Sequence, residues 1–217
     1  MRLSLQLSGL LAALAAAATF SGCGGRAAAE PSSQNAPAIT DSQPPSIPHP
    51  EFVNWQQFPI GTEVTRVRQV SNAESTVTVT TRTRLIDKTD RKITRETQTD
   101  VQRPNESLEQ NAPSSLEVPA SFVLPPGMQA EQFALPALKA QKTADEAIDV
   151  LGKQYVAQVY GWEDSSEAGP IRVQVWWCND FPGRVVQEKT VNMGTGVTSS
   201  EAVTGLKIPF PRAPQLP

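Results

Sequence analysis

The stretch Ser75–Ile86, STVTVTTRTRLI, constrains the fold of this chain more than any other part of the sequence. It is rich in β-branched residues, which favour extended backbone. One face of the expected strand carries Val77, Val79, Thr81, Thr83 and Leu85. Because successive side chains of a strand point to opposite faces, this pattern predicts a long β-strand with one face towards a core.

Two neighbouring segments have the same character. Thr62–Val70 alternates and is rich in β-branched residues, and Arg91–Val101 is a mostly polar segment that follows the turn residues Asp87–Asp90. Three adjacent strands with short turns between them predict an antiparallel meander.

The second half of the chain predicts further antiparallel strands. Residues 143–162 predict a hairpin with a tight turn at Leu151–Lys153, and residues 169–193 predict two strands joined by a Phe-Pro-Gly turn. A last strand is expected at Gly196–Ile208. The prolines within residues 103–142 predict a long, partly ordered connection, in which Pro136 would break or kink any helical turn.

Together these segments predict one all-β domain over residues 52–209, a single antiparallel meander of about eight strands. No segment has the period of a convincing amphipathic helix. Alternation alone does not decide between a curved open sheet, a sandwich and a barrel. The chain of 217 residues has room for one such domain with tails, and most of its 19 prolines lie outside the expected strands.

The N-terminus has the order of a secretory signal peptide. Arg2 precedes an apolar run, Leu3–Phe20, and the small residues Ser21 and Gly22 come before Cys23. The run is short and Ala-rich, and no positively charged cluster follows it, which argues against a transmembrane anchor. Residues 1–22 are therefore predicted to be a signal peptide.

The ending FSGC resembles the lipobox of bacterial lipoproteins, with Phe20 at a position where that family usually has an aliphatic residue. The resemblance implies cleavage between Gly22 and Cys23, and a lipid anchor of acyl chains such as palmitate at Cys23. Two or three acyl chains hold a protein stably at a membrane, whereas one does not. The resemblance also implies a place in the bacterial cell envelope, and Gly24 favours the outer membrane over the inner membrane.

Two further segments are predicted to lie outside the domain. Residues 23–51 are rich in Pro, Ala and Ser and cannot bury much apolar surface, so they are interpreted as a disordered tether. Residues 210–217 are interpreted as a proline-rich tail. The expected order is therefore membrane anchor, tether, folded domain and tail.

The folded part resembles uncharacterised envelope lipoproteins that begin with the pattern seen here in Trp55, Phe58, Gly61 and Thr62. Those proteins later carry a strand, a Pro-Gly turn and a returning strand, as in VWWCNDFPGRVVQEK. The layout is also similar to the curved half-barrels of lipoprotein-sorting carriers. The resemblance implies a curved open sheet or half-barrel and names no activity.

The inventory of reactive side chains argues against an enzyme. The sole histidine, His49, lies in the predicted tether, so neither a Ser-His-Asp nor a Cys-His site is expected. One histidine and one unlipidated cysteine, Cys178, are too few for a zinc site. The carboxylates Glu163, Asp164 and Glu167 are interpreted as a solvated hairpin loop. We therefore expect no catalytic residue, no metal and no cofactor.

The sharpest concentration of aromatic residues in the chain is Trp162, Trp176, Trp177 and Phe181. Three of them, Trp162, Trp176 and Phe181, are candidates for binding. Adjacent tryptophans on a strand point to opposite faces. We expect Trp177 to fill the core with its apolar strand neighbours. Trp176 shares a face with Arg172, so we expect it to contact solvent, a ligand, a partner or the membrane interface.

The function expected from these observations is a non-enzymatic, lipid-anchored envelope protein that binds a hydrophobic ligand or another envelope protein. A structural lipoprotein without a specific ligand is the alternative, and an enzyme that uses carboxylates is a third. A net charge of −3, with no basic patch interleaved with aromatic residues, gives no support for nucleic-acid binding. Cys178 is expected to be a small buried hydrophobe, with a redox-sensitive thiol as the alternative.

Overall fold

The computed structural model describes residues 45–209 of the chain. The predicted signal peptide, its cleavage site at Gly22, the predicted anchor at Cys23, most of the predicted tether and the proline-rich tail lie outside the described residues. Within residues 45–209, no helix is long and apolar enough to cross a bilayer.

Twelve strands, one short α-helix and one 3-10 helix follow one another along the described part of the chain. The first seven strands are β1 (Ser46–Pro48), β2 (Glu63–Ser71), β3 (Thr76–Lys88), β4 (Lys92–Gln102), β5 (Glu109–Gln110), β6 (Ser114–Pro119) and β7 (Ser121–Val123). The last five are β8 (Gln141–Val150), β9 (Lys153–Ser166), β10 (Gly169–Trp177), β11 (Val185–Asn192) and β12 (Thr198–Lys207). The helices are α1 (Pro50–Gln56) and η1 (Ala130–Ala134).

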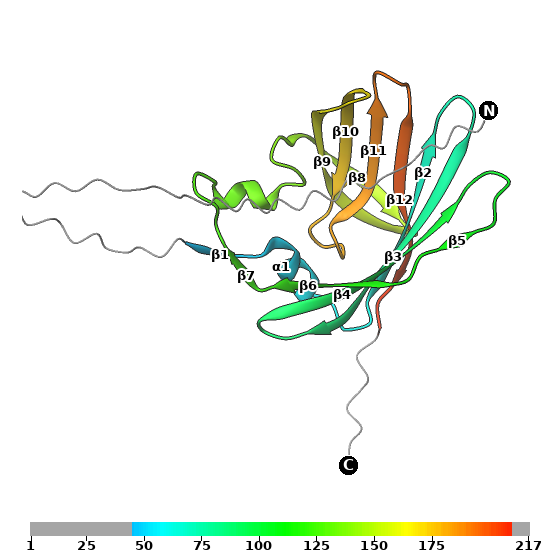
Figure 1. Ribbon diagram of the computed structural model, residues 1–217. Helices are drawn as coiled ribbons and strands as arrows, with labels where there is room; N and C mark the ends of the chain where they lie inside the picture. The colour runs from blue at the N-terminus through cyan, green and yellow to red at the C-terminus, as the bar shows by residue number, and fades with distance from the viewer. Residues whose placement is uncertain (1–44, 210–217) are drawn as a thin grey trace, which may run out of the picture. The chain divides into compact units, whose positions relative to one another are not determined.

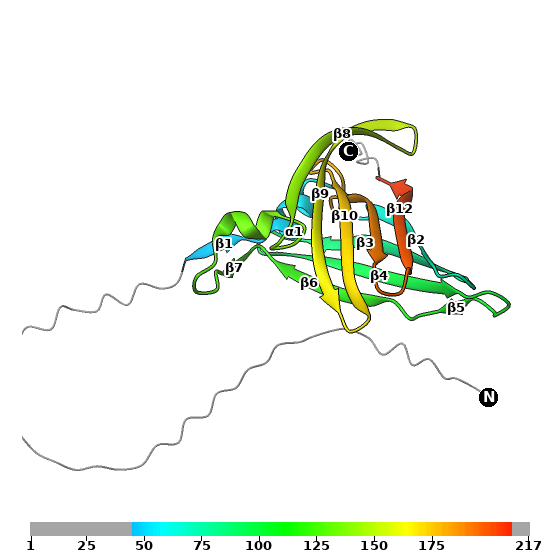
Figure 2. The same ribbon diagram turned by 90° about the horizontal axis from the view of Figure 1, so that it is seen from above.

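Ten of these strands form one open antiparallel sheet in the order β5-β4-β3-β2-β12-β11-β10-β9-β8, with β6 also paired to β4. Figures 1 and 2 show the curvature of this sheet. The predicted all-β class and the open curved sheet are confirmed. The topology differs in one respect from a single meander, because two meanders, β2 to β4 and β8 to β12, meet where β12 pairs with β2.

The alternation along β3 places the predicted face of this strand on the side of the sheet that α1 contacts. Val64 of β2 pairs with Thr83, and Leu85 is fully buried on the same face. Arg95 of β4 pairs with Leu85, and its guanidinium lies 5.7 Å from the centre of the Trp55 ring in α1. We call this side of the sheet the α1 face.

The folded part begins earlier than predicted. Residues 46–51, which the composition places in the tether, form β1 and the start of α1. The imidazole Nδ1 of His49 accepts a hydrogen bond from the Glu51 backbone N–H at 3.2 Å and so caps α1, and Pro50 occupies the first turn. The sequence analysis missed α1 because two helical turns are too short to show a helical period.

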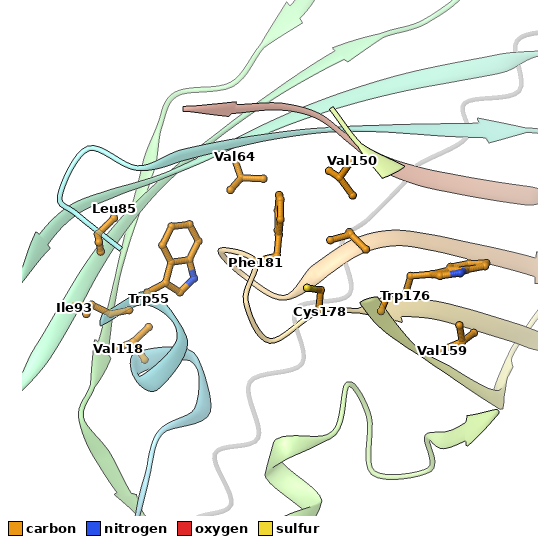
Figure 3. Packing of buried hydrophobic residues seen from close by; sticks show 12 residues of the cluster. Trp55, Val64, Leu85, Ile93, Val118, Val150, Val159, Trp176, Cys178 and Phe181 are labelled. Atoms are coloured by element: carbon orange, nitrogen blue, oxygen red, sulfur yellow. The ribbon is translucent and has the colours of Figure 1, made fainter. Parts of the chain in front are cut away.

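A buried cluster joins α1, the sheet and the loop between β10 and β11 (Figure 3). Trp55 of α1 and Phe181 of that loop are fully buried. Phe181 packs edge-on against Tyr155 of β9, with the ring centres 5.6 Å apart. Because large aromatic side chains bury about 150–250 Å² each, these two residues fix α1 and the loop on the α1 face.

The connection between β4 and β8 is more ordered than predicted. In β6, Val118 lies opposite Ile93 of β4, and both side chains are buried. β7 pairs with β1, so the segment before α1 and the segment after β6 lie side by side. Pro119 ends β6, where a missing N–H donor costs no ladder bond inside the strand, so the prolines do not prevent pairing.

Candidate binding groove

A groove of about 640 Å³ opens between the start of α1, the β6–β7 segment, the η1 region and the β10–β11 loop. Much of its wall is aromatic or apolar, and includes Phe122, Phe133, Leu135, Pro136 and Trp177. Three ionisable side chains also line it, those of His49, Glu51 and Arg184. We call it the aromatic groove. Its volume and its mixture of apolar wall and few polar groups are typical of small-molecule sites.

Asn54 fixes the position of the β10–β11 loop against α1. Its side-chain amide donates hydrogen bonds to the backbone carbonyls of Asn179, at 2.9 Å, and Phe181, at 3.0 Å. Its side-chain carbonyl accepts one from the backbone N–H of Gly183. Gly183 has φ +74°, and a Cβ there would lie 3.0 Å from a guanidinium nitrogen of Arg66, so a glycine suits this position.

Three aromatic rings in mutual contact form another part of the groove wall. The rings of His49 and Phe122 meet edge-on at 5.4 Å between centres, and those of Phe122 and Phe133 at 5.0 Å. Edge-to-face contacts at these separations are favourable for aromatic pairs. They connect the cap of α1 to strand β7 and η1, which lie more than 70 residues later in the sequence.

Trp177 and Arg184 form the wall on the side of the β10–β11 loop. The Trp177 side chain is only partly buried, and the guanidinium of Arg184 lies 5.5 Å from the centre of its ring. One guanidinium nitrogen of Arg184 donates a hydrogen bond to the Pro50 carbonyl at 2.6 Å. The Nε atom of Arg184 is buried and has no hydrogen-bond partner among the described residues.

The other charged groups of the groove are already paired. The Glu51 carboxylate binds the guanidinium of Arg95 on β4. Burial lowers the pKa of His49, which Glu51 partly opposes, so the imidazole is mostly neutral at pH 7. Burial also lowers the pKa of Arg184, although an arginine keeps its charge at any physiological pH. Glu51 opposes the lowering of the Arg184 pKa, so Arg184 and Arg95 share one carboxylate.

The expectation for the two adjacent tryptophans is wrong. Trp176 is the buried one, with 7% of its surface exposed, and Trp177 is the one that remains partly accessible. The indole N–H of Trp176 donates a hydrogen bond to the Glu146 carboxylate at 2.8 Å, and the Lys189 ammonium lies 5.2 Å from the ring centre. The polar strand neighbours of Trp176 suggested a solvent face, but side chains from β8 and β11 cover the ring.

The other two aromatic candidates do not join the aromatic groove. Phe181 is fully buried in the core and has no surface for a ligand. Trp162 is partly buried and lines a separate hollow of about 560 Å³, whose other lining residues include Arg172 and Gln174. The structure therefore does not bring Trp162, Trp176 and Phe181 together as one site.

Sequence reasoning missed Phe122, Phe133, Trp177 and Arg184 as groove residues. A usable signal was present, because Phe122 and Phe133 are the only aromatic residues between residues 103 and 142. Aromatic side chains in a segment that is otherwise polar and proline-rich indicate that it docks on the rest of the fold. His49 was also misplaced, because its location beside several prolines suggested a tether.

The middle of the α1 face carries charges instead of an open apolar surface. Arg68 of β2 binds Glu201 of β12 at 2.8 Å and lies 3.5 Å from Glu188 of β11. Arg66 is largely buried and donates hydrogen bonds to the Val185 carbonyl. Buried or partly buried ion pairs of this kind do not form a surface for an apolar ligand. A hydrophobic ligand therefore has its best site in the aromatic groove.

No group of three or more His, Cys, Asp or Glu side chains within residues 45–209 is arranged to hold a metal ion. The carboxylates at the β9–β10 tip are exposed, and two of them form ion pairs, Asp164 with Lys139 and Glu163 with Arg172.

Comparisons with known proteins show likenesses in structure alone. The sequence matches no protein-family model and no curated protein.

Three solved structures illustrate the likeness. The first, from Bacteroides fragilis, is described as a protein inferred to be exported with a YmcC-like fold; it is 7% identical over 69% of this chain and 97% of its own, with a TM-score of 0.41. A hypothetical protein from Chlamydia trachomatis is 12% identical over 80% of this chain and 99% of its own, with a TM-score of 0.39. A domain from Vibrio parahaemolyticus, inferred to belong to an outer membrane lipoprotein-sorting protein, is 10% identical over 74% and 92%, with a TM-score of 0.27. Likenesses at this level assign no substrate or partner to this chain.

Proposed function

We propose that this chain is a non-enzymatic binding module of the bacterial cell envelope, and that it holds a small hydrophobic ligand in the aromatic groove. The observation that supports the proposal is the partly accessible Trp177 in a groove of about 640 Å³ that also contains Phe122 and Phe133. Aromatic side chains contribute the largest apolar contact areas in binding sites. The polar α1 face argues against the alternative in which the curved sheet itself holds the ligand.

A neutral fluorescent probe tests this function. The protein is the chain without residues 1–22, carrying Cys23→Ser so that it remains soluble. N-phenyl-1-naphthylamine, which is apolar and uncharged, should show a saturable rise in fluorescence with the unaltered groove. Trp177→Ala should weaken its binding by about tenfold, because loss of about 1.4 kcal/mol of contact energy corresponds to that factor. Trp162→Ala, which changes a tryptophan outside the groove, is the matched control.

Two results would contradict the proposed function. One is the absence of saturable binding by any apolar probe, which would favour a structural lipoprotein without a ligand. The other is an equal loss of binding in Trp162→Ala and Trp177→Ala, which would place the probe elsewhere.

We further propose that the protein is held at the membrane through a lipid on Cys23, with the outer membrane favoured. The support is the order of residues around FSGC, in which Gly22 directly precedes Cys23. Mass spectrometry of the mature protein should find an N-terminal lipid-modified Cys23, and Cys23→Ser should release the protein from membranes. An unmodified N-terminus at another residue, or unchanged membrane association, would contradict the anchor.

A further inference from the structure

The guanidinium of Arg184 is a charged group of the aromatic groove whose hydrogen-bonding capacity the neighbouring residues do not fully use. The guanidinium lies against Trp177, donates one hydrogen bond to the Pro50 carbonyl and leaves its Nε without a partner among residues 45–209. Glu51 is the one carboxylate among the described residues that lines the groove; it is bound to Arg95, and its charge also acts on Arg184. Arg184 therefore shares the Glu51 carboxylate with Arg95, and a half-buried cation without a counterion of its own is costly unless a ligand supplies one.

We propose that the ligand of the aromatic groove is a monoanionic amphiphile, an alkyl or aryl chain that ends in a carboxylate, and that Arg184 binds the carboxylate. This inference rests on the proposed function, because it concerns the same groove.

Charge and geometry favour a carboxylate over other head groups. The groove is lined by one guanidinium, that of Arg184, and one carboxylate, that of Glu51. The same carboxylate binds Arg95 of β4, so these three groups together keep one positive charge when His49 is neutral. A carboxylate carries one negative charge and balances it, whereas a phosphate monoester carries about 1.5 to 2 at neutral pH. A guanidinium also offers a planar fork that matches the two oxygens of a carboxylate.

The position of Arg184 agrees with a ligand that has one apolar end and one charged end. Arg184 and Trp177 line the groove from the end of β10 and the β10–β11 loop, whereas Phe122 and Phe133 line it from β7 and η1. An apolar chain would lie along the rings of Phe122 and Phe133, and its carboxylate would lie beside Arg184. Displacement of water around this partly desolvated cation strengthens its attraction for an anion.

Dodecanoate and dodecanol provide a direct test, because they have the same chain and differ in charge. Binding of each, below the concentration at which micelles form, is measured by calorimetry with the chain that lacks residues 1–22 and carries Cys23→Ser. Dodecanoate should bind at least about tenfold more tightly than dodecanol, and dodecyl phosphate should bind less tightly than dodecanoate. Salt should weaken dodecanoate binding more than dodecanol binding.

Variants identify the residue responsible. Arg184→Met should remove most of the difference between dodecanoate and dodecanol, and Arg184→Lys should restore part of it. Arg172→Met is the matched control, because Arg172 is an arginine outside the groove that binds Glu163. If Arg184→Met does not fold, the comparison of the two ligands on the unaltered groove still decides whether a carboxylate is preferred, and Arg184→Lys tests the residue.

The outcomes separate the two proposals. Equal affinity for dodecanoate and dodecanol would contradict the proposal that the ligand carries a carboxylate, but it would agree with the proposal that the groove binds a hydrophobic ligand. Tighter binding of dodecyl phosphate would overturn the choice of a monoanion. A difference between the ligands that persists in Arg184→Met but is lost in Arg172→Met would overturn the role of Arg184. Binding of neither ligand, together with no binding of the neutral probe, would overturn both proposals.

Discussion

The side-chain carbonyl of Asn54 accepts a hydrogen bond from the backbone N–H of Gly183 at 2.7 Å, across 129 residues of sequence. The same side chain binds two backbone carbonyls of the β10–β11 loop, so one amide satisfies three backbone groups. Its exposed fraction is 1%. Asn54 therefore stabilises the aromatic groove by holding the β10–β11 loop, which contributes Gly183 and Arg184 to the groove wall.

Replacement of Asn54 by Ala should destabilise the fold by about 2–3 kcal/mol, because buried backbone donors and acceptors would lose their partner. Chemical denaturation measures this loss. Asn111→Ala is the control, since Asn111 is exposed and its change should stay within about 0.5 kcal/mol. Equal stability of Asn54→Ala and Asn111→Ala would contradict the role of Asn54.

Trp176 and Trp177 should respond to substitution in opposite ways. Trp176→Ala removes a buried indole and its hydrogen bond to Glu146, and should cost about 3–5 kcal/mol of unfolding free energy. Trp177→Ala removes a partly exposed ring and should cost about 1–2 kcal/mol, while it weakens binding in the groove. If Trp177→Ala lost more stability than Trp176→Ala, the assignment of Trp176 as the buried ring and Trp177 as the partly exposed ring would be wrong.

The Cys178 thiol should be unreactive in the folded protein. Cys178 is buried, and this burial raises the pKa of its thiol, so little thiolate forms at neutral pH. In protein that carries Cys23→Ser, Ellman's reagent should modify Cys178 slowly under native conditions and rapidly in denaturant. Fast modification of the folded protein would instead support a redox-sensitive thiol.

Glu188 should make the stability of the fold depend on pH. Burial raises the pKa of this carboxyl above its ordinary value of 4.5, an effect that Arg68 opposes and Glu201 reinforces. The folded state therefore binds more protons than the unfolded state between these two pKa values. The contribution of Glu188 to stability is present below pH 4.5 and decreases as the pH rises through the raised value.

Glu188→Gln should remove this part of the pH dependence, and denaturation at a series of pH values from about 4 to 8 measures it. Glu163→Gln, at an exposed hairpin carboxylate, is the control and should leave the profile unchanged. A profile that Glu188→Gln does not alter would show that Arg68 compensates the burial of Glu188 completely.

The sheet could be predicted from the sequence because alternation is a local property. Thr81 and Leu85 share a face whatever lies beyond the strand, and the turn at Leu151 requires only local backbone geometry. Leu151 has φ +56° and Gly152 +79°, as a tight hairpin turn demands. The core position of Trp176 could not be predicted, because it depends on Glu146 and Lys189 from two other strands.

The aromatic groove could not be predicted from the sequence either, because it also depends on contacts between segments that are far apart in the chain. His49, Phe122, Phe133 and Trp177 come from four segments that only the pairing of β1 with β7 and the bonds of Asn54 bring together. Composition also misled, because prolines beside His49 indicated a tether when they terminate β1 and begin α1. Residue type and spacing thus predicted the strands, while packing between remote segments determined the site.

The pairing of β12 with β2 joins the two meanders, so the sheet can form completely only after β12 has been synthesised. Arg68 and Glu201, which bind each other across it, are 133 residues apart. A chain that is synthesised from its N-terminus contains β2, β3 and β4 long before β12, so the edge of β2 that pairs with β12 has no neighbour during that interval. Contacts this distant in sequence form slowly, and an unpaired strand edge is prone to join other chains. The strand made last, β12, is therefore the one that protects the edge of β2 from aggregation.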